Sequence, residues 1–215
     1  MIDPGPTASK AGNRRPIAAR SNALVQRFSA WLARAGVAPN AISLASIVFA
    51  ALGAAALLGL EPPWGAWLCA LAIVLRLLCN LFDGLVAVEH GRKTPTGVLY
   101  NEVPDRIADS LFLVALGHAA GLPWCGWLAA LLAALTAYIR TLGGTVLPSQ
   151  DFRGPMAKPH RMWLMVAACA LAPLEAALAG TGYTLRVAVL VIAAGSALTC
   201  WTRLRAIARQ LREAA

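Results

Sequence analysis

The chain has 215 residues, of which 59% are hydrophobic and only 13% are charged. That composition excludes an ordinary soluble domain and is typical of a protein that crosses a membrane several times. The net charge of +9 would also suit nucleic-acid binding, but the basic residues form small clusters between apolar runs, so we expect membrane lipids as partners and no nucleic acid.

The first expected elements are a basic tail and an amphipathic helix. Residues 1–21 are rich in Gly, Pro and Ala and lack an apolar run, which indicates a flexible cytosolic tail. Residues 22–35 place Leu24, Phe28 and Trp31 on one face of a helix that is too short and too charged to span a bilayer. We therefore predict an interfacial helix before the first span.

Six apolar segments follow, each close to the roughly 20 residues that a helix needs to cross the hydrocarbon core. They lie at residues 41–60, 64–82, 106–121, 123–142, 161–179 and 183–202. The predicted fold class is therefore all-α: a polytopic integral membrane protein with six transmembrane helices. Together with the amphipathic helix they form one membrane domain, residues 22–202, and a basic cytosolic C-terminal tail, residues 203–215, follows it.

The basic residues also predict how the chain is oriented. The connections at residues 61–63, 121–123 and 180–182 carry no Lys or Arg, whereas the opposite ends of the spans carry most of the cations. Because cytoplasmic loops are enriched in Lys and Arg, both termini and the loop after residue 82 should face the cytoplasm. We expect an inner or plasma membrane of the bacterial type.

Half of the acidic residues gather where the second and third apolar segments meet. They are Asp83, Glu89, Glu102, Asp105 and Asp109. Carboxylates beside hydrocarbon are costly and are usually kept for a function such as holding a cation or moving a proton. The alternative is that these acids only pair with nearby cations such as Arg92 and Arg106.

The spacing of this segment predicts a site with oxygen ligands. Asn80 and Asp83 share a helix face at the end of the second span, and Asn101 and Asp105 share one at the start of the third. An antiparallel pair of helices would bring the two stripes face to face, which suits Mg²⁺ or Mn²⁺ together with substrate phosphates. Arg76, one turn before Asn80, either reaches toward the interface or pairs with an acid.

Residues 80–105 resemble the signature of the class I CDP-alcohol phosphotransferases, D-x2-D-G-x2-A-R-x8-G-x3-D-x3-D. The signature aligns without a gap, and the positions that match outright are Asp83, Gly84, Ala87, Gly97 and Asp105. Asn80 and Asn101 replace two of its aspartates, and Val88 replaces its arginine. The amphipathic helix and the six spans are also similar to the family, so the resemblance covers most of the chain and indicates a divergent subgroup.

The resemblance implies an enzyme of phospholipid biosynthesis, a CDP-alcohol phosphatidyltransferase. It would transfer a phosphatidyl group from CDP-diacylglycerol, or use another CDP-linked alcohol, with a small alcohol acceptor, and release CMP. The resemblance further implies Mg²⁺ or Mn²⁺ as cofactor and a homodimer. Two alternatives stay open: transfer of a CDP-linked headgroup to a diacylglycerol, and a non-catalytic CDP-lipid-binding subunit, which the Asn80, Asn101 and Val88 replacements motivate.

The resemblance also assigns roles to residues. Those on the metal side are Asn80, Asp83, Asn101 and Asp105, with Asp105 also the general base, and those beside the nucleotide are Gly84, Ala87 and Gly97. The family's four aspartates serve two metals, whereas Asp83 and Asp105 supply only two negative charges here. Glu102 and Asp109 are candidates for the missing charge, and Arg92 for the phosphate contact that Val88 lacks.

A basic segment after the fourth span predicts an acceptor site. Arg140 lies at the end of that span, and Lys158 and Arg161 lie one turn apart before the fifth. Similar positions in the family form a polar pocket for headgroup or acceptor phosphates, so the resemblance places these three residues in an acceptor or phosphate pocket. The alternative is ordinary enrichment of cations on the cytoplasmic side.

Overall fold

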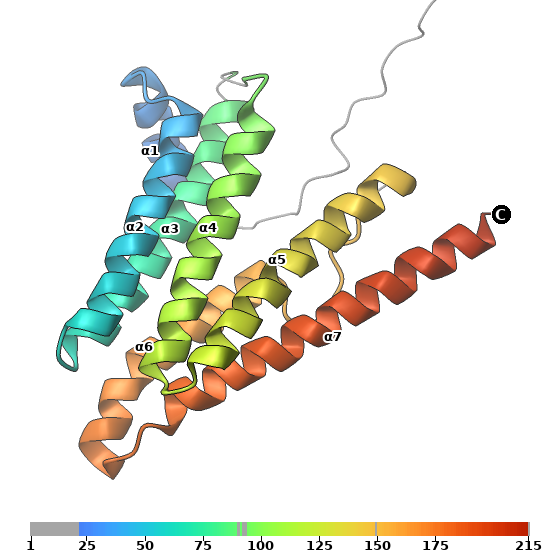
Figure 1. Ribbon diagram of the computed structural model, residues 1–215. Helices are drawn as coiled ribbons and strands as arrows, with labels where there is room; N and C mark the ends of the chain where they lie inside the picture. The colour runs from blue at the N-terminus through green and yellow to red at the C-terminus, as the bar shows by residue number, and fades with distance from the viewer. Residues whose placement is uncertain (1–21, 90, 92–93, 149, 215) are drawn as a thin grey trace, which may run out of the picture.

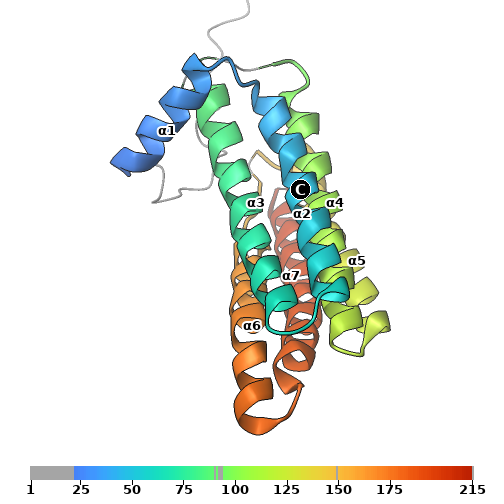
Figure 2. The ribbon, with the colours of Figure 1, turned by 90° about the vertical axis from the view of Figure 1, so that its left-hand side faces the viewer.

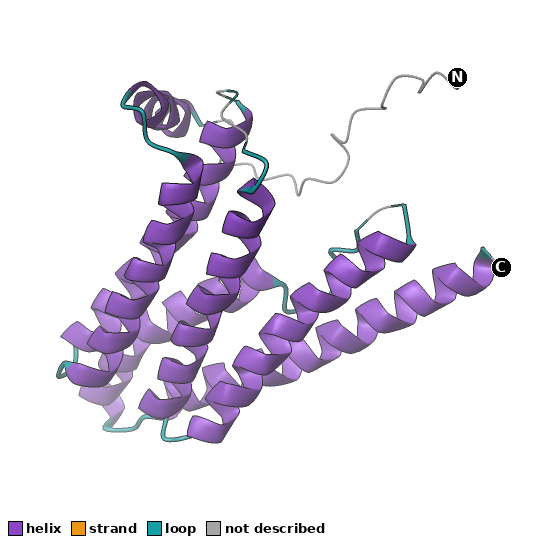
Figure 3. Cartoon of the chain, turned by 45° about the horizontal axis from the view of Figure 1, so that its top comes forward, coloured by secondary structure: helices purple, strands orange, loops and turns teal. Residues whose placement is uncertain are grey.

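The computed structural model describes residues 22–89, 91, 94–148 and 150–214. All regular structure within these ranges is helical, as Figure 3 shows, which confirms the all-α prediction. The helices are α1 (Ala23–Arg34), α2 (Pro39–Gly59), α3 (Trp64–Val88), α4 (Gly97–Ala119), α5 (Pro123–Val146), α6 (Lys158–Ala179) and α7 (Tyr183–Glu213). The tail at residues 1–21 and the candidate Arg92 lie outside the described residues.

The sequence marks the helix ends by residue type. Proline stands at the first or second position of α2, α5 and α6, where its missing N–H costs nothing. Gly180 ends α6 in the left-handed conformation, with φ 65°. At α1, Asn22 caps the helix by accepting a hydrogen bond from the Leu24 backbone N–H at 2.9 Å.

Helix α1 leans away from the other helices at one end of the molecule (Figure 2). Leu24, Phe28 and Trp31 are exposed along it. The Phe28 ring also packs on Phe82 of α3, with the ring centroids 4.8 Å apart. An apolar face left open beside a membrane protein is what an interfacial helix requires.

Among the described residues, five helices are long and apolar enough to cross a membrane: α2, α3, α5, α6 and α7. The protein is therefore a polytopic membrane protein, as predicted. Helix α4 has 23 residues but carries four charged side chains, Glu102, Asp105, Arg106 and Asp109, and is not among the five, so six spans remains a prediction. Helix α7 continues to Glu213, and most of the predicted C-terminal tail is therefore helical.

Helix α2 packs against both α3 and α4, while α5 packs against α4 and α7 and α6 against α3 and α7. Gly53 explains why α2 fits between its two neighbours. A Cβ atom there would lie 2.6 Å from Cβ of Ala72 on α3 and 2.8 Å from Cε1 of Phe112 on α4. The hairpin helices α3 and α4 thus meet mainly through α2, and contact each other directly at few positions.

Helices α4 and α5 touch at one end and separate toward the other. A Cβ atom on Gly117 would lie 2.5 Å from Cα of Gly126, so only glycine allows the two backbones this approach. From that crossing the helices diverge toward the end of the molecule that holds the α3–α4 connection (Figures 1 and 3). The polar side chains described below lie on the diverging halves.

Candidate active site

Two adjoining cavities lie near the ends of α3 and α4 that the acidic hairpin joins. The motif cavity, about 410 Å³, is lined by residues that include Ser43, Asp83, Gly84, Ala87, Gly97 and Asn101. The basic cavity, about 170 Å³, is lined by residues that include Asp105, Arg106, Lys158, Arg161 and Arg203. Glu102 and Arg140 line both, so the two cavities meet at this pair.

The structure therefore gathers most of the predicted residues into two groups. The nucleotide-side residues Gly84, Ala87 and Gly97 share the motif cavity with Asp83 and Asn101. The residues predicted for the acceptor, Arg140, Lys158 and Arg161, share the basic cavity with Asp105. Asp109 is among the lining residues of neither.

Asp83 is a buried carboxylate with one oxygen left over. Its Oδ2 accepts a hydrogen bond from the Ser43 hydroxyl at 2.6 Å. Its Oδ1 is buried and has no hydrogen-bond partner among the described residues. A buried, charged oxygen without a partner is costly, and a cation relieves that cost. This oxygen of Asp83 is therefore available as one ligand for a divalent metal.

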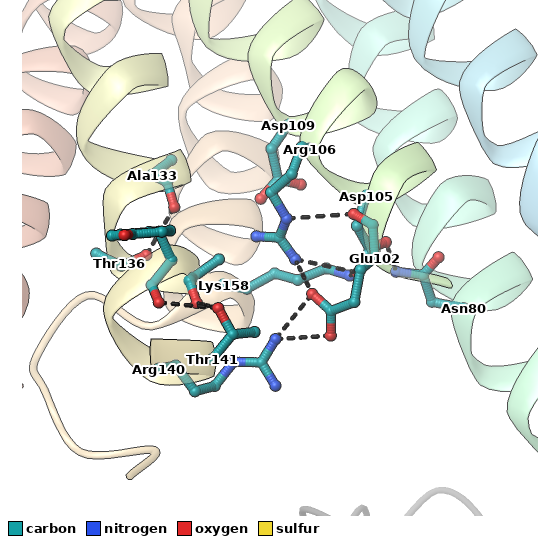
Figure 4. A network of polar contacts seen from close by, with 12 residues as sticks. Asn80, Glu102, Asp105, Arg106, Asp109, Ala133, Thr136, Arg140, Thr141 and Lys158 are labelled. Carbon is teal, nitrogen blue, oxygen red and sulfur yellow. Dashed lines mark hydrogen bonds and ion pairs between the residues drawn. The ribbon is translucent and has the colours of Figure 1, made fainter. Parts of the chain in front are cut away.

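Asp105 is surrounded by cations and donors. Its Oδ1 accepts hydrogen bonds from Asn80 Nδ2 at 2.7 Å and from Arg76 Nη2 at 3.1 Å. Its Oδ2 forms an ion pair with Lys158 and lies 3.7 Å from Nη2 of Arg106. Figure 4 shows Asn80 and Lys158 reaching Asp105 from different helices. The carboxylate lies on the wall of the basic cavity, with its charge balanced by neighbours on three helices.

A second layer of buried charge lies behind Asp105. Arg76 is fully buried, and its Nη2 donates to Asp109 Oδ1 at 2.5 Å and to the backbone oxygen of Asp105 at 3.2 Å. The other oxygen of Asp109 lies 3.4 Å from Nη2 of Arg161. Asp109 thus connects two buried arginines. Of the two interpretations of Arg76, reaching toward the interface or pairing with an acid, the structure shows the second.

Glu102 and Arg140 join α4 to α5 where the cavities meet. Nη2 of Arg140 lies 2.7 Å and 2.8 Å from the two oxygens of Glu102, and Nη2 of Arg106 lies 3.0 Å from Oε2 (Figure 4). Nη1 of Arg140 donates to Gln150 at 2.9 Å. Glu102 supplies charge at this boundary, in contact with cations of both cavities.

Four contributors were not among the predicted site residues: Ser43, Arg76, Arg106 and Arg203. Arg203 is buried and donates to the backbone oxygens of Arg153 and Thr136 at 2.7 Å and 2.6 Å. It belongs to a run of four C-terminal arginines, and the run alone does not show which one turns inward. With it, five cations and two carboxylates line the basic cavity, which suits an anionic ligand.

Comparison with known proteins gives the family that the chain resembles. A family model described as CDP-alcohol phosphatidyltransferase matches residues 36–201. A phosphatidylinositol phosphate synthase of Mycolicibacterium smegmatis (strain ATCC 700084 / mc(2)155) is 26% identical over 188 residues, covering 81% of this chain and 79% of the relative.

The fold is also similar to crystal structures of the Mycobacterium tuberculosis phosphatidylinositol phosphate synthase. The structure with CDP-DAG bound has a TM-score of 0.70 at 19% identity, covering 86% of this chain and 94% of that one. The complex with manganese and citrate has a TM-score of 0.70 at 19% identity, covering 85% and 88%. At this identity the likeness establishes the shared fold.

Proposed function

This chain belongs to the CDP-alcohol phosphatidyltransferase family, and from that premise we propose that its acceptor is an inositol phosphate. As a family member it is a transferase of phospholipid biosynthesis, which moves a phosphatidyl group from CDP-diacylglycerol to an alcohol and releases CMP. The proposal adds that the alcohol carries a phosphate of its own. The name of the M. smegmatis relative supports that choice of acceptor.

The observation that carries the proposal is the excess of cations in the basic cavity. Five cations line the cavity with only two carboxylates, and a phosphate balances the excess charge and accepts several charge-assisted hydrogen bonds from Arg and Lys, which an uncharged alcohol does not do. Arg161 is buried there, and its Nε has no hydrogen-bond partner among the described residues, so an anionic ligand has a donor to meet. At about 170 Å³ the cavity also suits a small polar ligand.

The reaction then takes place between the two cavities. The phosphate of the acceptor lies among Arg140, Lys158 and Arg161, which directs a hydroxyl toward Asp105 on the same wall. Asp105 takes the hydroxyl proton as the oxygen bonds to the phosphorus that carries the diacylglycerol. The bond from that phosphorus to the bridging oxygen breaks, and CMP leaves through the motif cavity.

The motif cavity would hold the nucleotide and the metal. Gly84 and Gly97 leave its wall without side chains where the phosphates of the donor approach. Asp83, through its partnerless oxygen, and Asn101, through its side-chain carbonyl, are the residues that would hold Mg²⁺ or Mn²⁺. When bound there, the ion neutralises the pyrophosphate and polarises the phosphoryl group.

We place the site at the cytoplasmic face and both termini on that side. In Figure 1 the α3–α4 connection and the C-terminus lie toward one end, and the turns after α2, α4 and α6 lie toward the other. The first end carries Arg153, Arg205 and Arg209, and residues 61–63, 121–123 and 180–182 at the second carry no Lys or Arg. A homodimer is proposed from the family resemblance.

The test is CMP release by the purified protein with CDP-diacylglycerol and Mn²⁺. Inositol phosphate should support release, whereas inositol, glycerol and serine should give at most a hundredth of that rate. Equal rates with inositol and inositol phosphate would overturn the assignment of the acceptor. CMP release from a CDP-linked headgroup with diacylglycerol would support the headgroup-transfer alternative, and no release with any acceptor would support the binding subunit.

A further inference from the structure

We propose that this site binds a single divalent cation. Arg76 and Lys158 supply the positive charge beside Asp105 that a second cation would otherwise supply. The proposal rests on the proposed function only in assuming a metal at the motif cavity. Its readout is the number of ions bound, which requires neither an acceptor nor turnover. A failure of the proposed acceptor would appear in CMP release, and a failure of the proposed metal count would appear in the number of ions bound, so the two failures can be distinguished.

The first observation is that both oxygens of Asp105 already face cations or hydrogen-bond donors of the protein. A carboxylate has roughly four lone-pair positions. Two on Oδ1 meet Asn80 and Arg76, and one on Oδ2 meets Lys158. Arg106, 3.7 Å from Oδ2, adds positive charge but no hydrogen bond, which leaves one position on Oδ2 for the hydroxyl of the acceptor. The carboxylate is 6% exposed, so its surroundings are fixed by packing on α3, α4 and α6.

The second observation is that Arg76 is buried inside the protein and is not a surface side chain that could move away from the site. Its exposed fraction is 0%, and a single nitrogen, Nη2, bonds to Asp105 and Asp109. Removing one member of a buried ion pair leaves the other charge uncompensated, which makes such pairs hard to separate. Arg76, Lys158 and Arg161 already outnumber the two acids they contact, Asp105 and Asp109. A divalent ion added to this group meets net positive charge.

The third observation is the amide of Asn80. It stands one turn after Arg76 on α3 and donates Nδ2–H to Asp105. An ionised carboxylate only accepts hydrogen bonds, so the NH₂ group of the amide must face it. An aspartate at position 80 would instead repel Asp105 and need a cation between them. Asn80 and Arg76 together therefore occupy Oδ1 of Asp105 without a metal.

Asp83 differs from Asp105 in each of these respects. One of its oxygens has no partner among the described residues, and it lines the motif cavity with Asn101. Glu102 also lines that cavity, but both of its oxygens bond to Arg140. One carboxylate oxygen is thus available among these groups, which fits one ion.

The parent protein is tested by counting Mn²⁺ ions. We expect calorimetry and metal analysis of the purified protein, titrated with Mn²⁺ alone and with Mn²⁺ in the presence of CDP-diacylglycerol, to give one ion per chain. The electron paramagnetic resonance spectrum should be that of isolated Mn²⁺ ions. Two ions per chain, or the broadened spectrum of a coupled Mn²⁺ pair, would overturn the proposal.

The double variant R76M/N80D tests the role assigned to Arg76, because it removes the buried cation and adds a carboxylate. It should bind a second Mn²⁺ and show spin coupling between the two ions. The control N22D makes the same amide-to-acid change at the cap of α1, at a residue that lines neither cavity, and should bind one ion. A folded double variant that still binds one ion would overturn the role of Arg76.

If the double variant does not fold, N101D provides the second measurement. It adds a carboxylate beside Asp83 without disturbing the group around Arg76, and Asn101 is exposed. Its Mn²⁺ affinity without nucleotide should rise by at least tenfold, with the count still one per chain. A count of two in N101D would show that Arg76 and Lys158 do not exclude the second ion, and would overturn the proposal.

Discussion

Ser43 of α2 donates a hydrogen bond from its hydroxyl to Oδ2 of Asp83 on α3 at 2.6 Å, and both side chains are buried. The bond engages Oδ2 and leaves Oδ1 without a partner among the described residues. Partners of this kind orient metal ligands and are as much a part of a metal site as the ligands are. Helix α2, which carries none of the motif residues, thus contributes to the candidate metal site.

Replacing Ser43 with alanine should therefore weaken Mn²⁺ binding by about 10- to 100-fold, the usual cost of losing such a partner. Calorimetric titration with Mn²⁺ measures the effect. S46A is the matched control, because Ser46 is buried on the same helix and bonds only to the backbone oxygen of Ser43. Equal affinity in S43A and S46A would mean that the Ser43–Asp83 bond does not support the metal.

D105N should abolish CMP release, with a loss of at least about 100-fold, because the amide keeps the size of the side chain but cannot take a proton. Rates are measured per folded protein, since Asp105 also pairs with Arg76 and Lys158. D109N removes a buried acid that lines neither cavity and should lower stability more than the rate. Activity of D105N within threefold of the parent would remove Asp105 from the role of base.

R140Q should raise KM for inositol phosphate by about 10-fold or more, the cost of losing a charge-assisted hydrogen bond of roughly 1.5 to 3 kcal/mol. KM for CDP-diacylglycerol should change much less. The control R205Q removes an arginine that lies over the Trp201 ring, 5.5 Å from its centroid, and lines neither cavity. A similar KM for inositol phosphate in both variants would contradict the assignment of Arg140 to the acceptor.

G117A should destabilise the protein, because its Cβ would meet Cα of Gly126 at 2.5 Å. Overpacking of this kind costs about 1 to 3 kcal/mol, and a lower unfolding temperature in detergent, by several degrees, is expected. G59A is the control, since a Cβ there has nothing within 4 Å. Identical unfolding temperatures would show that the α4–α5 crossing can relax.

Orientation is tested by single cysteines in a cysteine-free background. A cysteine at Lys93 should react with an impermeant thiol reagent only from the cytoplasmic side, and one at Gly180 only from the opposite side. The native cysteines to be replaced are Cys69, Cys79, Cys125, Cys169 and Cys200. Reversed labelling would place the site away from a cytosolic CDP-linked donor.

Local patterns were enough to predict the helices, and of the four predicted metal-side residues the structure places Asp83 and Asn101 on one cavity, Asp105 on the other and Asn80 on neither. The apolar segments give the helices, and the i,i+3 and i,i+4 spacings of residues 80–105 put Asp83 and Asn101 on one cavity. The direct pairing of the two hairpin helices was expected as well. Helix α4 instead packs mainly on α2 and α5, because Gly53 and Gly126 let those backbones approach it.

The residues that the sequence did not assign to the site depend on how helices rotate against each other. Ser43 stands in an apolar run, where a serine most often bonds to its own backbone. From the sequence, Arg76 could either reach toward the interface or pair with an acid. The position of α4 beside α3 decides that its guanidinium contacts Asp105. Sequence spacing fixes which residues share a helix face, but not which face of the next helix lies opposite.

The pairing of Arg76 with Asp105 and Asp109 also has a consequence for how α3 and α4 are inserted into the membrane during synthesis. A charged residue at the centre of an isolated helix costs about 2.5 to 3.5 kcal/mol at insertion, and α4 carries four charged side chains. Arg76 belongs to α3, which leaves the ribosome first, so a partner for these acids is already at the bilayer when α4 follows. Helices α3 and α4 are therefore expected to leave the translocon as one unit, with α4 depending on its predecessor for entry.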